Sequence, residues 1–121
     1  MRKQILLFVL IISIIFAFGQ TVIQNAISTS EYVRKGNSVY YHDTLFTGTA
    51  IKKADNGQII VEEHYENGIA NGHWKEWYAT GKKKFEGKFV DGKNDGEWIQ
   101  WYEDGTVQRK INFENGMPKD K

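Results

Sequence analysis

Residues 72–92 read GHWKEWYATGKKKFEGKFVDG, and residues 96–116 read GEWIQWYEDGTVQRKINFENG. The second stretch repeats the first after 24 residues, with Gly, Trp, a Trp-Tyr pair and further glycines at matching places. A weaker copy begins 24 residues earlier at Gly48 and keeps the glycines without the tryptophans. A fixed period of this kind is typical of a repeat array, in which each unit buries its apolar surface against the next.

Each copy has three glycines at matching places, and in seven of the nine cases the preceding residue is Asn or Asp. Asn-Gly and Asp-Gly tolerate positive φ and favour tight hairpins, so we predict a backbone turn at all three places. The first slot holds Thr47-Gly48, Asn71-Gly72 and Asp95-Gly96, the second holds Asn56-Gly57, Thr80-Gly81 and Asp104-Gly105, and the third holds Asn67-Gly68, Asp91-Gly92 and Asn115-Gly116.

The segments between these slots have the length and composition of β-strands. They are rich in aromatic and β-branched residues, which suit a half-buried pleated surface. The predicted strands are Thr49–Ala54, Gln58–Tyr65, His73–Tyr78, Lys82–Val90, Glu97–Tyr102 and Thr106–Phe113. Apolar and charged residues alternate in the second strand of each repeat, which is typical of an antiparallel sheet with one wet face. We therefore predict an all-β fold, an elongated antiparallel sheet of stacked β-hairpins.

The two tryptophans of each repeat do not fit simple alternation. Trp74 and Trp77 are three residues apart, so a regular strand sends them to opposite faces. Either a bulge brings both inward, or one of each pair stays exposed. The sequence leaves this choice open.

The unit G-x-W-x-x-W-Y-x-x-G-x(7)-F-x-[ND]-G, read at Gly72–Gly92 and Gly96–Gly116, resembles the MORN repeat in the longer variant form found in many bacterial proteins. The first copy departs from it, because Ala50 replaces the first Trp, and Lys53 and Ala54 replace the Trp-Tyr pair. The resemblance implies an elongated sheet of stacked hairpins and a role in protein–protein or membrane association. Members of the variant group often carry the label of a toxin–antitoxin antitoxin.

Residues 1–19 have the pattern of a secretory signal peptide. Arg2 and Lys3 precede a 14-residue apolar run, Ile5–Phe18, broken only by one serine, and small residues place cleavage between Gly19 and Gln20. The alternative is an uncleaved anchor, but a helix of this length spans only about 21 Å, less than a hydrocarbon core of about 30 Å. We expect an exported mature chain that is periplasmic, at the cell surface or secreted.

The mature chain divides into a lead-in and a repeat domain. Residues 20–37 have no strong period and form either a flexible lead-in or an N-terminal cap, which a repeat array needs at its open end. Residues 38–121 form the repeat domain, with repeats at about 48–71, 72–95 and 96–119. We interpret Ser38 to His42 as the last strand of a degenerate leading repeat.

Charge and composition exclude several classes of function. The predicted mature chain has 14 Lys and Arg against 15 Asp and Glu, a net charge of −1, so it lacks the general attraction to nucleic acid that a basic protein has. There is no cysteine, which excludes disulfides and thiolate metal sites.

The remaining residues do not form a recognisable catalytic, metal or cofactor set. His42, His64 and His73 are the only histidines, and their spacing suits no metal site, although His64 could approach Glu62 on one strand face. The glutamates are spread over repeating strands beside lysines, which indicates cross-strand pairing. We therefore predict no enzyme, no metal and no cofactor.

The aromatic residues of the two strong repeats are the candidate partner-binding site. They form two rows at one-repeat spacing: Trp74, Trp77, Tyr78, Trp98, Trp101 and Tyr102. They either serve only as the core of a thin repeat protein or leave an aromatic stripe that binds a partner, since Trp and Tyr give large rigid contact areas. The leading function is a non-enzymatic exported module that binds a protein. The alternatives are binding of envelope glycan or phospholipid through the stripe, and an antitoxin-like inhibitor of an effector.

Overall fold

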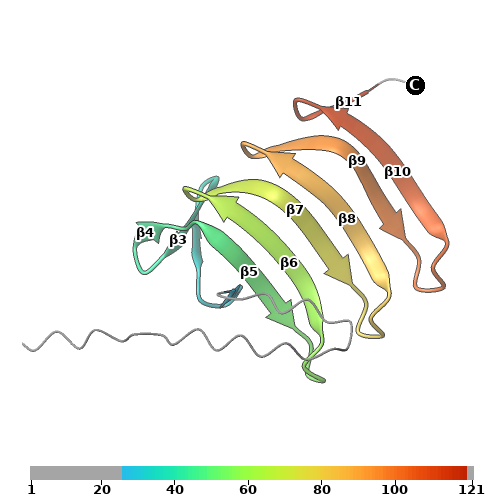
Figure 1. Ribbon diagram of the computed structural model, residues 1–121, viewed down its shortest axis with the longest axis horizontal. Helices are drawn as coiled ribbons and strands as arrows, with labels where there is room; N and C mark the ends of the chain where they lie inside the picture. Colours follow the sequence, from blue (N-terminus) through green and yellow to red (C-terminus); the bar gives the residue numbers. More distant parts are fainter. Residues whose placement is uncertain (1–25, 120–121) are drawn as a thin grey trace, which may run out of the picture.

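The computed structural model describes residues 26–119, which form eleven β-strands without a helix (Figure 1). The predicted signal peptide, residues 1–19, and its cleavage site lie outside the described residues. Within residues 26–119 there is accordingly no helix that could cross a membrane. The predicted all-β fold, a large antiparallel sheet of consecutive hairpins, is confirmed.

Eight strands form the large sheet, hydrogen-bonded in the order β1-β5-β6-β7-β8-β9-β10-β11, and three form a small sheet, β2-β3-β4. The large sheet contains β1 (Ile27–Ser28), β5 (Gly48–Lys53), β6 (Ile59–Glu66), β7 (Ile69–Trp77), β8 (Lys83–Val90), β9 (Lys93–Trp101), β10 (Val107–Glu114) and β11 (Met117–Pro118). The small sheet contains β2 (Val33–Lys35), β3 (Ser38–Tyr41) and β4 (Thr44–Leu45). Figure 1 shows bent hairpins side by side, with the small sheet at the N-terminal end of the array.

Two-residue turns at the third glycine slot join β6 to β7, β8 to β9 and β10 to β11. At Asn67-Gly68 the two φ angles are 48° and 77°, and Glu66 pairs with Ile69 across the turn. Positive φ at both central residues gives the type I′ turn, whose twist matches that of the strands. Each turn glycine also ties its hairpin to the preceding one: Gly68 N donates to Phe46 O, Gly92 N to Ala70 O and Gly116 N to Asn94 O, at 2.7, 2.8 and 2.9 Å.

Turns at the second slot close the opposite ends of the hairpins. The amide of Gly81 donates to the Tyr78 carbonyl at 2.8 Å, and the amide of Tyr78 donates to the Lys82 carbonyl at 2.9 Å. Gly57 and Gly105 make the same pair of bonds in their own repeats. The predicted turns at the second and third slots are therefore present.

The first slot is not a turn, and our prediction there was wrong. Strands β7 and β9 continue without interruption through Gly72 and Gly96, and Gly48 is the first residue of β5. The strands are instead bulged: between the pairs Glu63↔Trp74 and Tyr65↔Ala70, β7 advances four residues while β6 advances two. Positive φ at Gly72 and Gly96, 113° and 70°, accommodates this bulge. Each repeat is therefore one long hairpin rather than three short segments.

The large sheet has an aromatic face and a polar face, as the alternation predicts. The aromatic face carries Tyr65, Trp74, Phe85, Phe89, Trp98 and Phe113. On the polar face, Glu62, Lys75 and Glu86 stand opposite one another on three neighbouring strands. Alternating charge across a sheet is stabilising, whereas like charges would repel.

Residues 26–47, which we call the N-terminal segment, pack on the aromatic face over β5 and β6. β1 pairs with β5 in parallel, and Val39 and Phe46 form a buried cluster with Ala50 and Tyr65. The amide of Val39 donates to the Gly68 carbonyl at 2.8 Å, which fixes β3 to the first long hairpin. The aromatic face of β7 to β10 lies beyond this cover.

The strand predicted at Ser38 to His42 is present as β3, but it pairs with β2 and β4 and not with the large sheet. Its hairpin turn falls at His42-Asp43, where both φ angles are positive. A strict 24-residue register puts that turn at Asp43-Thr44, so the leading unit is one residue out of step with the array.

Candidate ligand pocket on the aromatic face

The two tryptophans of each repeat lie on opposite faces of the sheet. From Trp74 onward β7 pairs residue by residue with β6, so alternation puts Trp77 on the polar face. A bulge is present, but it lies on β8, where the pairing slips between Phe85 and Lys83, and it does not bring Trp77 inward. Trp101 has the same place in the next repeat. Both side chains are half-buried.

Trp98 is a core residue of the aromatic face. Its ring centroid lies 5.2, 4.8 and 6.2 Å from those of Phe85, Phe89 and Phe113. The ring covers Gly87, where a Cβ atom would overlap the indole. Only 7% of Trp98 is exposed. The interpretation of the aromatic rows as core is therefore correct for this residue.

Trp74 has the same position one repeat earlier but a more open environment. It packs against Phe89, at 5.6 Å between ring centroids, and its Nε1–H donates to Glu76 Oε1 at 3.1 Å. Position 63 on β6 corresponds to position 87 on β8, but it carries a glutamate side chain instead of a glycine. The Trp74 indole therefore cannot lie directly on the strand backbone as the Trp98 indole does. Trp74 is half-buried.

The remaining members of the predicted set lie on the polar face or at the hairpin ends. Lys83 Nζ lies 5.7 Å from the Trp101 ring centroid. Tyr78 donates its hydroxyl proton to the Trp101 carbonyl at 2.8 Å and so joins two repeats. Tyr102 is 50% exposed. The structure therefore does not bring the six predicted residues together in one site.

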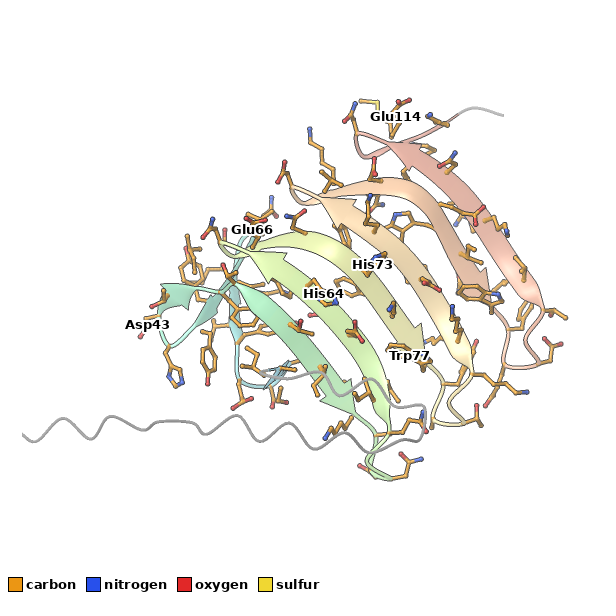
Figure 2. The ribbon with its side chains drawn as sticks, viewed as in Figure 1. Asp43, His64, Glu66, His73, Trp77 and Glu114 are labelled. Atoms are coloured by element: carbon orange, nitrogen blue, oxygen red, sulfur yellow. The ribbon has the colours of Figure 1, made fainter. Side chains whose placement is uncertain are left out.

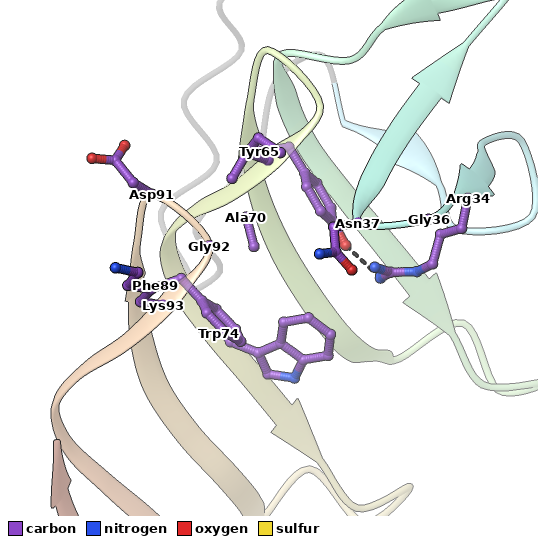
Figure 3. Close-up of a pocket in the computed structure, with 11 residues that line it drawn as sticks. Arg34, Gly36, Asn37, Tyr65, Ala70, Trp74, Phe89, Asp91, Gly92 and Lys93 are labelled. Carbon is purple, nitrogen blue, oxygen red and sulfur yellow. Dashed lines mark hydrogen bonds between the residues drawn. The ribbon is translucent and has the colours of Figure 1, made fainter. Parts of the chain in front are cut away.

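A pocket of about 470 Å³ lies between the N-terminal segment and the aromatic face (Figure 3). Arg34 and Asn37 come from the N-terminal segment, whereas Trp74 and Phe89 face them from β7 and β8. Ala70 lines the pocket between them. In Figure 3 the carboxylate of Asp91, another lining residue, points away from the cavity. Apolar walls with a few polar groups are typical of ligand pockets.

A buried carboxylate network holds one wall of this pocket. Glu63 is 5% exposed, and its Oε2 accepts hydrogen bonds from the hydroxyls of Tyr32 and Tyr65, both at 2.8 Å. Arg34 Nη2 lies 3.7 Å from the same oxygen and donates to the Tyr65 hydroxyl at 2.6 Å. Burial, with the hydrogen bond to Glu63 as the next cause, raises the pKa of the Tyr65 phenol and that of Tyr32. The carboxylate is thus paired and hydrogen-bonded, as a buried charge must be.

The family model of the MORN repeat variant matches residues 46–67, 70–91 and 94–115, three segments that start 24 residues apart and cover more than half of the chain. The chain belongs to the MORN repeat variant family. Searches of curated proteins and of solved structures find no match. MORN repeats are generally non-enzymatic modules that associate with proteins or membranes.

The MORN match explains part of the pocket. Tyr65, Trp74 and Phe89 lie inside the matched segments, at positions that recur through the array, whereas Arg34 and Asn37 lie outside them. The sequence identified the recurrence of Tyr65 and Phe89 but did not assign them to the site, and it missed Arg34 and Asn37. The MORN period could not have found Arg34 and Asn37, because they come from the non-repeating segment.

The polar face of the MORN array carries the histidine contact that the sequence suggested. His64 Nε2 lies 2.8 Å from Glu62 Oε1, and His64 Nδ1 lies 3.1 Å from the Thr49 hydroxyl. In the part of the chain that the structure describes, no group of three His, Asp or Glu residues is placed to hold a metal ion. These two contacts orient the His64 imidazole ring among the polar side chains of the sheet (Figure 2).

Proposed function

We propose that the chain is an exported, non-enzymatic MORN module that binds a partner protein through the aromatic face of β7 to β10. The observation that supports this is the incomplete cover of that face. The N-terminal segment packs over β5 and β6, whereas Trp74, Phe85, Phe89 and Phe113 are half-buried and have no second layer over them within residues 26–119. Partly exposed aromatic side chains gathered on one face of a sheet are characteristic of an interaction site.

The polar face supports partner binding less well. Its charges pair along the sheet, with Lys83 2.7 Å from Glu86 and Lys88 3.4 Å from Asp95. Trp77 and Trp101 lie within this charged surface rather than in a continuous apolar patch. A partner that covered these residues would have to remove paired charges from water, which is costly.

The test captures the partner from the native host with the full chain and two matched charge variants. Phe85→Asp introduces a carboxylate on the aromatic face, and Lys75→Asp introduces one on the polar face. We expect capture of a stoichiometric protein that Phe85→Asp abolishes and Lys75→Asp preserves, with both variants folded by circular dichroism. Loss with Lys75→Asp alone would contradict the proposal, as would sedimentation with protein-free liposomes or envelope glycan in place of a protein partner.

Export has its own test. Mass spectrometry of the chain recovered outside the cytoplasm should give an N-terminus at Gln20, as the sequence predicts. Recovery of the intact N-terminus in the cytoplasmic fraction would contradict export without affecting the assignment of the binding face.

A further inference from the structure

The pocket lies where the MORN pattern is broken. In the last two hairpins Trp98 fills the space over Gly87 and packs on Phe85 and Phe89. One repeat earlier, Glu63 occupies the place of Gly87 and keeps Trp74 from taking the same position. A space that the repeat pattern would fill with an indole ring is therefore left open between Trp74 and the N-terminal segment.

Tyr65 contributes to the same opening. Its counterpart Phe89 packs on Trp98 at 4.8 Å, whereas Tyr65 packs on Tyr32 at 5.9 Å and on Phe46 at 6.0 Å. Its hydroxyl is fixed by Glu63 and Arg34. The cavity is thus walled by a hydrogen-bonded network and cannot collapse without breaking it. Departures from a local rule that are held in place by a network of this kind are expected at functional sites.

Two polar groups of the N-terminal segment face the aromatic wall across the cavity (Figure 3). All the hydrogen bonds that Arg34 donates to described residues come from Nη2, which leaves the donors on Nε and Nη1 for a ligand. Asn37 is an exposed residue, and its side-chain amide makes no hydrogen bond to another residue within 26–119. A guanidinium with spare donors is suited to a carboxylate.

We propose that this cavity binds a segment of the partner protein in which an aromatic side chain lies next to a carboxylate side chain. The aromatic ring packs on Trp74 and Phe89, and the carboxylate accepts hydrogen bonds from Arg34 and Asn37. This inference rests on the proposed function and names the chemistry that the partner presents. Lys93 also lines the cavity, but its side chain extends along Gly116 of the next hairpin.

A peptide fits the cavity better than a sugar. Ile69, Ala70, Trp74 and Phe89 supply the apolar part of the wall, and Arg34 and Asn37 supply polar groups opposite it. A sugar would bury several hydroxyl groups, more than Arg34 and Asn37 can pair, and a buried polar group without a partner weakens binding. An aromatic side chain with one carboxylate leaves no such group.

The test selects peptides from a random dodecapeptide library on the immobilised full chain and measures the best binder by fluorescence polarisation. We expect enriched sequences with an aromatic residue next to Asp or Glu. Asn37→Asp, an isosteric change that adds a negative charge, should weaken the peptide roughly ten-fold, and Asn37→Lys should strengthen it. Asn112→Asp, the same change on the polar face at β10, should leave the affinity unchanged.

A second pair of variants tests the cavity without changing its charge. Ala70→Phe fills the cavity and should abolish binding, whereas Asn94→Phe, the equivalent change one repeat later, should not, with the fold of both checked by thermal melting. Absence of enriched peptides, enrichment without acidic residues, or equal affinity of Asn37→Asp and wild type would overturn the inference. If the captured partner responds to Phe85→Asp but not to Asn37→Asp, the proposed function stands and this inference fails.

Discussion

The indole ring of Trp98 lies directly on the backbone of Gly87, in the space that a side chain at position 87 would occupy. Gly87 is buried in the middle of β8, and it is the absence of a Cβ atom there that lets the indole reach the strand. The contact joins β8 to β9 and thereby the first strong repeat to the second. The preceding repeat has no such contact, because Glu63 takes the place of Gly87 there and the pocket lies beside it.

Gly87→Ala should therefore destabilise the fold by overpacking. The added methyl group would overlap the Trp98 ring, and insertion of a methyl group into a packed core costs about 1–3 kcal/mol. Urea unfolding followed by tryptophan fluorescence measures the change. Lys88→Ala, at the next position on the polar face, should cost less than about 0.5 kcal/mol, and Trp98→Leu in the Gly87→Ala background should recover part of the loss.

The two tryptophans of the last repeat should contribute unequally to stability. Trp98→Ala removes a 7% exposed ring from the aromatic cluster, and such truncations cost about 3–5 kcal/mol. Trp101→Ala removes a half-buried ring from the polar face and should cost about 1–2 kcal/mol. The free energy of unfolding of each variant checks this. Equal losses would contradict the placement of the two rings on opposite faces.

The repeating part of the fold could be predicted because its determinants are local. Asn67-Gly68 tolerates the positive φ angles that its turn requires, and alternation decides which side chains share a face with Tyr65. The bulge at Asn71-Gly72 could not be distinguished from a turn, because the same dipeptide serves both. Asn71-Gly72 forms a bulge rather than a turn because β6 continues opposite it. This depends on how the two strands pair and not on the sequence of the dipeptide.

The pocket could be predicted only in part, because half of it is not repetitive. Trp74 stands out from the period alone. Arg34 and Tyr65 are 31 positions apart in the sequence, and no pattern in the N-terminal segment predicts the hydrogen bond between them. Glu63 affects the pocket because it carries a side chain where the next repeat has Gly87. This effect can be recognised only by comparing the two repeats, because its result is an open space rather than a contact.

The hydroxyl of Tyr78 should stabilise the junction between two repeats. It donates to the Trp101 carbonyl at 2.8 Å, so Tyr78→Phe removes one inter-repeat hydrogen bond and should cost about 0.5–1.5 kcal/mol. Tyr102→Phe is the matched control, because Tyr102 has the same place one repeat later and is 50% exposed. Thermal melting should separate the two variants, and equal melting temperatures would show that the bond contributes nothing.

Alkaline pH should loosen the N-terminal segment from the array. The pKa of Tyr65 is raised above its ordinary value of 10.0 by burial and by its hydrogen bond to Glu63, so the native state keeps a proton that the unfolded state loses. Stability is therefore full below about pH 10 and falls as the pH rises above it, because the unfolded state then binds fewer protons. The melting temperature, measured from neutral to alkaline pH, should decline steeply from that point.

Tyr65→Phe distinguishes this cause from the general effect of alkali on lysines. The variant loses two hydrogen bonds and should be less stable at neutral pH, but its melting temperature should fall less steeply above about pH 10, since one of the two phenols with a raised pKa is gone. Tyr102→Phe removes an exposed phenol and should leave the slope unchanged. A slope in Tyr65→Phe as steep as in the wild type would place the alkaline sensitivity elsewhere than at the Glu63 network.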